Sequence, residues 1–174
     1  MNTFGQPDRT EAPEYYFTYI DQAGDGDIRA MLRAQLADTV TLLQGVTDEM
    51  SLHRYAPDKW TIREVVNHLN DTERLFVFRA LWFARGFDSP LPSFDPDAAV
   101  AISAADDRSW SSHIEEFRAV RSATVAFFET LPAAAWARQG VASGNTFTVR
   151  ALAYITAGHT AHHARLLRTD YLPR

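Results

Sequence analysis

The chain reads Thr61-Ile62-Arg63-Glu64-Val65-Val66-Asn67-His68-Leu69, and this stretch gives the clearest indication of its fold. Thr61 and Glu64 have the spacing of a capping box, in which each side chain bonds to the backbone N–H group of the other residue at the start of a helix. Apolar residues then recur every three or four positions as far as Phe83, and Gly86 follows as a stop signal. The pattern predicts an amphipathic helix from Thr61 to about Arg85.

Three further segments show the same helical period. They run from about Asp27 to Val46, from about Ser109 to Thr130, and from Thr148 towards Pro173, where the proline prevents continuation. The first and last of these segments begin at residue types that are favoured as helix N-caps. Four amphipathic helices of these lengths, with no convincing strand pattern, predict an all-α four-helix bundle.

The connections between these helices differ in length. Residues 86–105 form a long connection with little helical period, containing Pro90, Pro92 and Pro96, and this suits a crossover between the second and third helices. Residues 140–147, before the fourth helix, are small and polar, which indicates a loop or a short extended piece. We therefore expect a single domain over residues 1–174, with residues 1–20 as a peripheral N-terminal segment.

Composition narrows the classes of function. The 174 residues carry a net charge of -5 and no Lys/Arg cluster, so the basic face that nucleic-acid binding usually needs is absent. No apolar run approaches the roughly 20 residues that span a bilayer, and the polar N-terminus has no signal-peptide core. We expect a cytoplasmic protein without nucleic-acid or membrane partners. The lack of cysteine excludes disulfides, Cys-ligated zinc and a catalytic thiol of the protein itself.

Three of the six histidines stand together in the stretch Gly158-His159-Thr160-Ala161-His162-His163. Successive residues of a helix are about 100° apart, so His159 and His163 lie about 40° apart on one face. Apolar residues of the fourth helix share that face, which predicts that both imidazoles point into the bundle. His68 falls on the apolar side of the second helix and is also expected to face inward.

A divalent metal would use all three imidazoles and would remove the cost of burying them without partners. Three protein ligands leave one coordination position open for water or substrate, which is the pattern of catalytic sites. The alternative is that the His-x-x-x-His pair is solvated, or that one member is a core histidine bonded to a carbonyl. No glutamate lies within the pair, so the motif His-Glu-x-x-His of zinc proteases is absent.

Two residues near the predicted triad are candidates for a catalytic or supporting role. His162 could replace His163 as a ligand, act as a pocket residue beside the metal, or simply be solvated. Asp71 stands three positions after His68 and could orient that ligand, or it could be an exposed acid.

The remaining titratable residues of these helices have simpler explanations. The capping box accounts for Glu64 without any function. Glu73 is about 140° from His68 around the helix and is expected on another face. His53 and His113 have no comparable neighbours in the sequence, and we interpret both as surface or loop residues.

Two stretches resemble the signatures of the DinB-like family. The family's second-helix signature is matched by Tyr55-Ala56-Pro57-Asp58-Lys59-Trp60 and its continuation through His68 to Arg74. Its fourth-helix signature is matched by Ala157-Gly158-His159-Thr160-Ala161-His162-His163, preceded by Arg150-Ala151-Leu152-Ala153-Tyr154-Ile155. The match runs from about Gly26 to Pro173 in the right order and spacing.

The resemblance implies an up-down-down-up four-helix bundle with a long crossover between the second and third helices. It also implies a divalent metal, zinc or nickel before iron or manganese, held by three histidines. Carried onto this chain residue by residue, the ligands are His68, His159 and His163. Members of the family are commonly homodimers.

The activity that the resemblance implies is less specific. Relatives include S-transferases and isomerases that use a low-molecular-weight thiol, and others described as metal-dependent hydrolases. We therefore expect a metal-dependent enzyme that transfers a small-molecule thiol to an electrophilic small-molecule substrate, in which the metal holds the sulfur as a thiolate. The alternatives are a metal-dependent hydrolase and a bundle that binds a metal or small ligand without turnover.

Overall fold

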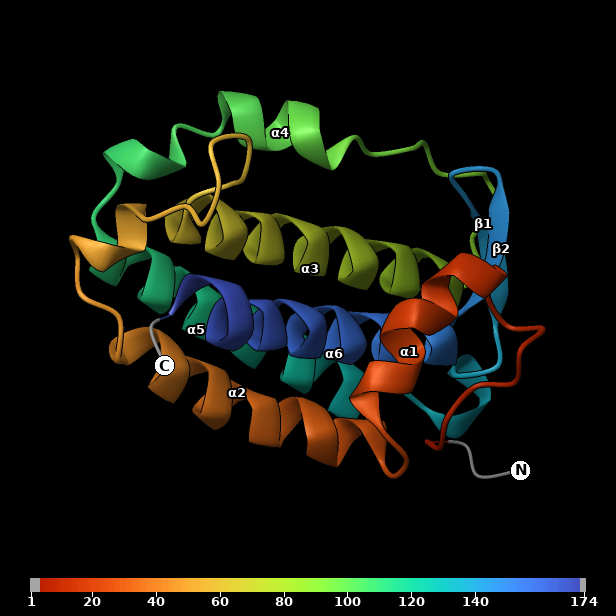
Figure 1. Ribbon diagram of the computed structural model, residues 1–174. Coiled ribbons are helices and arrows are strands. Elements are labelled where there is room, and N and C mark those ends of the chain that lie inside the picture. Colours follow the sequence, from red (N-terminus) through yellow and green to blue (C-terminus); the bar gives the residue numbers. More distant parts are fainter. Residues whose placement is uncertain (1–3, 173–174) are drawn as a thin grey trace.

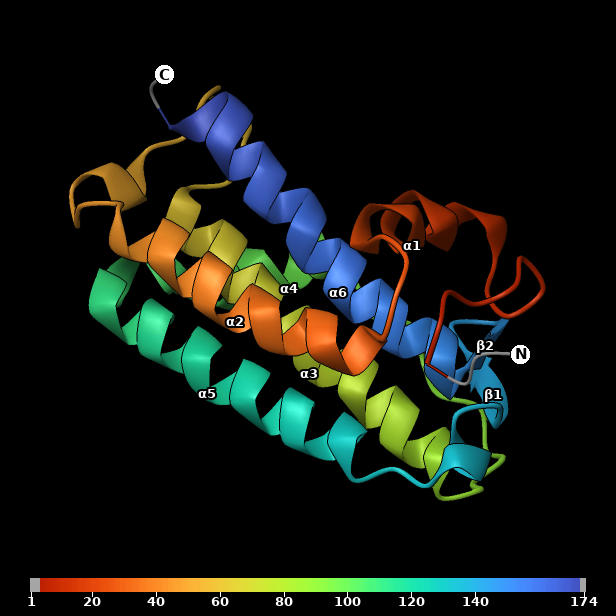
Figure 2. The same ribbon diagram turned by 90° about the horizontal axis from the view of Figure 1, so that it is seen from below.

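A computed structural model describes residues 4–172. Four long helices lie side by side as a bundle (Figures 1 and 2): α2 (Ile28–Gln44), α3 (Ile62–Ala84), α5 (Trp110–Glu129) and α6 (Val149–Leu166). Two shorter helices, α1 (Phe17–Ala23) and α4 (Pro96–Ile102), flank them. The remaining elements are short 3₁₀ turns at Glu14–Tyr16, Met50–Leu52, Ala105–Asp107 and Ala133–Ala135, a π-helical turn at Leu167–Tyr171, and two strands, β1 (Gln139–Ala142) and β2 (Asn145–Thr148).

All four predicted helices are present, and each begins at a side-chain cap. Asp27, Thr61, Ser109 and Thr148 each accept a hydrogen bond from a backbone N–H in the first turn of their helix. The capping box of Thr61 and Glu64 is complete in both directions, as predicted. The mostly helical bundle is thus confirmed, while its up-down-down-up order and its single-domain limits stay predictions. Pro173, expected to prevent continuation of the fourth helix, lies outside the described residues.

Residues 140–147, expected as a loop or a short extended piece, belong to two short strands and the turn between them, which the all-α prediction did not include. β1 and β2 pair as an antiparallel hairpin in which Ala142 faces Asn145. The two turn residues, Ser143 and Gly144, both have positive φ angles, of 53° and 73°, which suits a tight hairpin turn. Strands of four residues are too short to show an alternating pattern in the sequence.

The long connection between α3 and α5 is confirmed, but it contains a helix that the sequence did not predict. Asp95 caps α4, and Pro96 occupies its first turn, where a missing N–H costs nothing. Figure 1 shows α4 running along α3 on the outside of the bundle. Leu91, earlier in the same connection, forms a parallel bridge with Ala142 of β1. The connection is therefore attached to both α3 and the hairpin.

Helix α6 is the most deeply buried element of the bundle. Every residue from Ala151 to Thr160 is buried, because α1 covers the side of α6 that would otherwise face solvent (Figure 2). Phe17 and Ile20 of α1 are themselves buried against this core. The N-terminal segment, expected to be peripheral, therefore supplies one wall around the histidines of α6.

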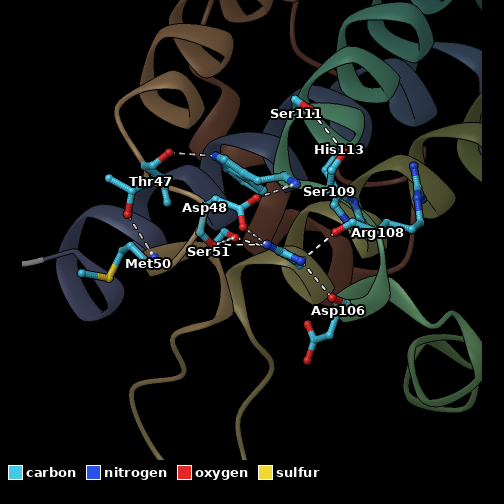
Figure 3. A network of polar contacts seen from close by, with 12 residues as sticks. Thr47, Asp48, Met50, Ser51, Asp106, Arg108, Ser109, Ser111 and His113 are labelled. Atoms are coloured by element: carbon cyan, nitrogen blue, oxygen red, sulfur yellow. Dashed lines mark hydrogen bonds and ion pairs between the residues drawn. The ribbon is translucent and has the colours of Figure 1, made fainter.

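A buried arginine holds the start of α3 in place. The Arg63 guanidinium donates hydrogen bonds to the Ser51 hydroxyl and to the backbone carbonyls of Asp106 and Arg108, over distances of 2.7 to 2.8 Å. It also pairs with the Asp48 carboxylate at 2.9 Å. Figure 3 shows these groups gathered around one guanidinium. The network ties the α2–α3 loop and the α4–α5 loop to the helix that carries His68.

His113 belongs to the same end of the bundle, and its assignment as a surface or loop residue was wrong. It lies in α5 with no exposed surface, and its Nε2 atom is 2.9 Å from the carbonyl oxygen of Ala105 (Figure 3). The 3₁₀ turn at Ala105–Asp107, which the sequence did not predict, supplies this acceptor and covers the histidine. His53, by contrast, is exposed as predicted.

None of the helices in residues 4–172 is long and apolar enough to cross a membrane.

Candidate metal centre

Three buried imidazoles meet between α3 and α6. The Nε2 atom of His159 lies 3.1 Å from Nε2 of His68 and 3.2 Å from Nε2 of His163. One ring nitrogen from each of the three residues lies within 4.8 Å of the other two. All three side chains are at most 7% exposed. The structure thus brings together the three histidines that the sequence singled out, and their role as metal ligands stays a prediction.

The spacing of these atoms fits a divalent metal. Imidazole nitrogens bind zinc at about 2.0–2.1 Å, so two ligands of a tetrahedral site are about 3.3 Å apart. The two measured Nε2 separations are close to that value. A single ion could therefore contact the nitrogens with small adjustments of the rings. Three imidazoles suit zinc, nickel, iron or copper better than magnesium or calcium, which prefer oxygen ligands.

Burial keeps these imidazoles neutral. Loss of solvent lowers the pKa of His68 to about 4 and that of His163 to about 3, with the neighbouring His68 and His162 adding to the effect on His163. The pKa of His159 is held well below 6.5, mainly by burial and then by His163 and His68. A neutral imidazole has a free lone pair on one nitrogen, which is the form that binds a metal.

Thr72 selects which nitrogen of His159 carries the proton. Its hydroxyl donates to the carbonyl oxygen of His68 at 2.6 Å, so the hydroxyl oxygen remains as an acceptor. The Nδ1 atom of His159 lies 3.4 Å from that oxygen. With the proton on Nδ1, the Nε2 lone pair is directed at His68 and His163. This is the arrangement of a ligand oriented by an outer hydrogen bond.

The sequence did not single out Thr72, although a signal for it was present. Thr72 stands four positions after His68, so it lies on the same side of α3. Its partner on α6 could be identified only once the packing of the two helices was known.

His162 lies beside the triad rather than in it. Its Nδ1 atom is 3.4 Å from the side-chain nitrogen of Gln22, and its ring contacts the ring of Tyr19 edge-on at 5.5 Å between centroids. It is half-buried, and both burial and the charge of Arg165 lower its pKa. The predicted alternative of a pocket residue fits this position. A catalytic role for His162 stays a prediction.

The structure places Asp71 away from the imidazoles. Its carboxylate accepts a hydrogen bond from Asn67 at 2.9 Å and lies 3.6 Å from the guanidinium of Arg74. Among the described residues it makes no hydrogen bond to His68. Burial raises its pKa, although Arg74 acts in the opposite direction. The expected orienting role therefore has no direct contact to support it.

Glu73, expected on another face of the helix than His68, is buried and pairs with a different helix. Its carboxylate receives two hydrogen bonds from Arg121 of α5, at 2.8 and 2.7 Å, and both side chains are at most 3% exposed. Arg121 also donates to Gln35 of α2 and to Thr160 of α6. This buried network joins all four long helices next to His159 and holds the histidine-bearing turn of α6 against α3.

A cavity of 370 Å³ opens onto the triad. This is within the usual size range of sites for small molecules. His162, Thr72 and Arg79 supply polar atoms, and the rest of the wall is largely aromatic and aliphatic: Tyr15, Tyr16, Tyr19, Trp60, Leu75, Phe76 and Phe94. The ring of Trp60 lies 4.8 Å from that of His68, and the ring of Tyr19 lies 5.2 Å from that of His159.

The three tyrosines of this wall come from the N-terminal segment, which the sequence did not connect with the site. They sit at positions 15, 16 and 19, on the 3₁₀ turn before α1 and on α1 itself. The hydroxyls of Tyr15 and Tyr19 lie 3.3 Å apart, and burial together with Tyr15 raises the pKa of Tyr19. No pattern in the sequence connects a seven-residue helix with residues some 140 positions away.

Comparisons with known proteins agree with this fold. A family model described as the DinB superfamily matches residues 31–167. Among solved structures, YfiT from Bacillus subtilis aligns with a TM-score of 0.69 at 18% identity, over 97% of this chain and 97% of its own. YfiT is described as a probable metal-dependent hydrolase with an unusual four-helix bundle topology. A search of curated proteins finds no match. At this level of identity the likeness to YfiT concerns the fold alone.

Proposed function

We propose that this chain, which belongs to the DinB superfamily, is a metal-dependent enzyme that transfers a small-molecule thiol to an electrophile. His68, His159 and His163 would hold a divalent metal, with zinc or nickel before iron or manganese. The observation that carries this proposal is the convergence of three imidazoles at the wall of a 370 Å³ cavity, where Nε2 of His159 lies 3.1 Å from Nε2 of His68 and 3.2 Å from Nε2 of His163.

The position of the triad suits catalysis better than a purely structural metal. Three protein ligands leave a tetrahedral ion one further position. The cavity lies next to the triad, so a small molecule in it could reach that position. Bound there, the metal would supply a positive charge that stabilises a thiolate or polarises a substrate atom.

The lining of the cavity favours a thiol as the nucleophile. The side chains around the triad are aromatic, aliphatic, hydroxyl-bearing and basic. The described residues that line the cavity include no acid, and the carboxylates of Asp71 and Glu73 on α3 are occupied by Asn67, Arg74 and Arg121. A thiol needs only to lose its proton to become reactive. Since the chain contains no cysteine, the sulfur has to come from a small molecule.

Hydrolysis is the alternative, and one residue supports it. His162 lies against His163, with 5.0 Å between ring centroids, and could accept a proton from a water molecule in the cavity. The description of YfiT as a probable metal-dependent hydrolase points the same way, although it applies to that protein. A third candidate, a bundle that binds a metal without turnover, requires neither His162 nor the cavity.

A conjugation assay separates these functions. The protein is loaded in turn with zinc, nickel, iron or manganese and mixed with monobromobimane and each of several small thiols. We expect thiol consumption that a chelator abolishes and that the His159→Ala variant lacks. The exposed His53→Ala variant is the matched control and should behave as the wild type. No thiol-dependent turnover with any metal, together with chelator-sensitive ester cleavage, would establish the hydrolase instead.

A further inference from the structure

Arg79 is a buried cation in the wall of the same cavity. Its side chain is 2% exposed, and it lines the cavity together with the three histidines. Its Nη2 atom donates to the carbonyl oxygen of Pro92 at 3.0 Å and to the hydroxyl of Ser143 at 2.9 Å. Its Nε atom is buried without a hydrogen-bond partner. Both acceptors are neutral, as is the Tyr16 hydroxyl that also interacts with Arg79, so none of them compensates the charge of the guanidinium.

The other two buried arginines among the described residues, Arg63 and Arg121, have carboxylate partners. Arg63 pairs with Asp48 at 2.9 Å, and Arg121 pairs with Glu73 at 2.7 Å. Within residues 4–172, Arg79 forms no ion pair. A buried charge without a counter-charge costs several kcal/mol, so proteins rarely keep one without a use for it. Arg79 therefore differs from Arg63 and Arg121 in having no carboxylate partner.

Arg79 and the triad line the same cavity but lie about three helical turns apart along α3. Arg79 stands eleven residues after His68 on α3, which is close to three full helical turns, so the two residues share one face. Their Cα atoms are therefore about 16 Å apart along the helix axis. Thr72 and Phe76 lie on the same face between them. The wall of the cavity thus carries both the imidazoles and a guanidinium at a distance from them.

We propose that Arg79 binds a carboxylate of the ligand whose other end reaches the metal. This inference rests on the proposed function, because it takes the triad as the metal site, and it specifies the ligand class. The ligand would be an elongated molecule with a metal-binding group, such as a thiol, at one end and a carboxylate at the other. The aromatic wall between the two ends would contact its apolar middle.

Binding measurements on the zinc-loaded protein test this inference without any assay of activity. The probes are the monohydroxamates of adipic, suberic and sebacic acid, in which the hydroxamate binds zinc and the far end is a carboxylate. Each is compared with the compound in which that carboxylate is a primary amide. At the chain length that spans the cavity, we expect the carboxylate to bind at least about tenfold more tightly. In the Arg79→Gln variant, the affinities for the carboxylate and the amide should differ by less than about twofold.

The control variant and the possible outcomes make the test decisive. Ser143→Ala removes one hydrogen bond of Arg79 but keeps its charge, so it should retain the preference. If Arg79→Gln does not fold, Arg79→Met replaces it, because methionine preserves the apolar stem. Equal affinities for carboxylate and amide at every length, or a preference that survives loss of Arg79, would overturn the inference alone. A protein that binds none of zinc, nickel, iron and manganese would overturn the proposed function and this inference together.

Discussion

A Cβ atom on Gly158 would lie 1.9 Å from the backbone carbonyl oxygen of Tyr19. The backbone of α1 therefore rests directly on α6, one residue before His159. This contact places Tyr19 against the imidazoles and closes one side of the cavity. Only glycine permits so close an approach.

Gly158→Ala should therefore push α1 away from α6. Backbone atoms cannot rotate out of the way, so we expect the free energy of unfolding to fall by about 1–3 kcal/mol, as for other overpacked sites. Unfolding in urea measures this loss. The matched control is Gly45→Ala, where the added atom would meet its nearest neighbour at 3.4 Å and should change stability by less than about 1 kcal/mol. Equal stabilities of the two variants would contradict the close packing of α1.

Removal of Arg121 should be among the most destabilising changes in the chain. Arg121→Met leaves the Glu73 carboxylate buried without its partner, which costs about 3–5 kcal/mol. The double variant Arg121→Met, Glu73→Leu removes both charges and should be more stable than the single variant. Urea unfolding compares them, with the exposed Arg118→Met as the control. If the double variant is less stable than Arg121→Met alone, the pair is not the reason for the loss.

Thr72→Val should weaken metal binding without unfolding the bundle. Valine has the shape of threonine but cannot accept the hydrogen bond from Nδ1 of His159. Loss of such an outer hydrogen bond lowers metal affinity by about 10- to 100-fold. Competition with a zinc chelator gives the affinity. Thr124→Val, which removes a buried hydroxyl of α5 that donates to the carbonyl oxygen of Val120, is the control and should bind zinc as the wild type does.

His113 should make a measurable contribution to the pH dependence of stability. Burial lowers the pKa of His113 below 6.5, while its hydrogen bond to Ala105 acts in the opposite direction. The pKa of His113 is about 6.5 in the unfolded chain and lower in the folded one. Between the two, the unfolded chain binds more protons, so the free energy of unfolding falls as the pH drops below 6.5. His113→Gln lacks this loss. In urea unfolding, the variant's loss of free energy of unfolding relative to the wild type should be largest at pH 8 and should shrink towards pH 5. A loss that is the same at every pH would contradict the lowered pKa of His113.

The helices of this bundle were predictable because each carries its own start signal. Asp27, Thr61 and Thr148 cap helices whose apolar period extends over several turns. The hairpin and α1 were not predictable, since four-residue strands and a seven-residue helix are too short for a period to emerge. They depend instead on tertiary contacts, such as that between Gly158 and Tyr19.

The candidate site was predictable to the extent that helical spacing determines it. His159 and His163 are four residues apart on α6, and His68 falls on the apolar side of α3. These two facts were sufficient to group the three imidazoles. The same spacing on α3 indicates Thr72 and Arg79, but their significance appears only when α6 and the hairpin turn are in place. His113 was misassigned because burial at the bundle end depends on the loops that cover it. The homodimer, the thiol and the absence of nucleic-acid partners stay predictions.

The metal content of the purified protein tests the central claim most directly. Elemental analysis should find about one zinc or nickel ion per chain in the wild type and in the exposed variant His53→Ala. We predict that His159→Ala, which removes the imidazole shared by both short Nε2 contacts, retains almost none. Equal metal content in the wild type and in His159→Ala would contradict the metal site.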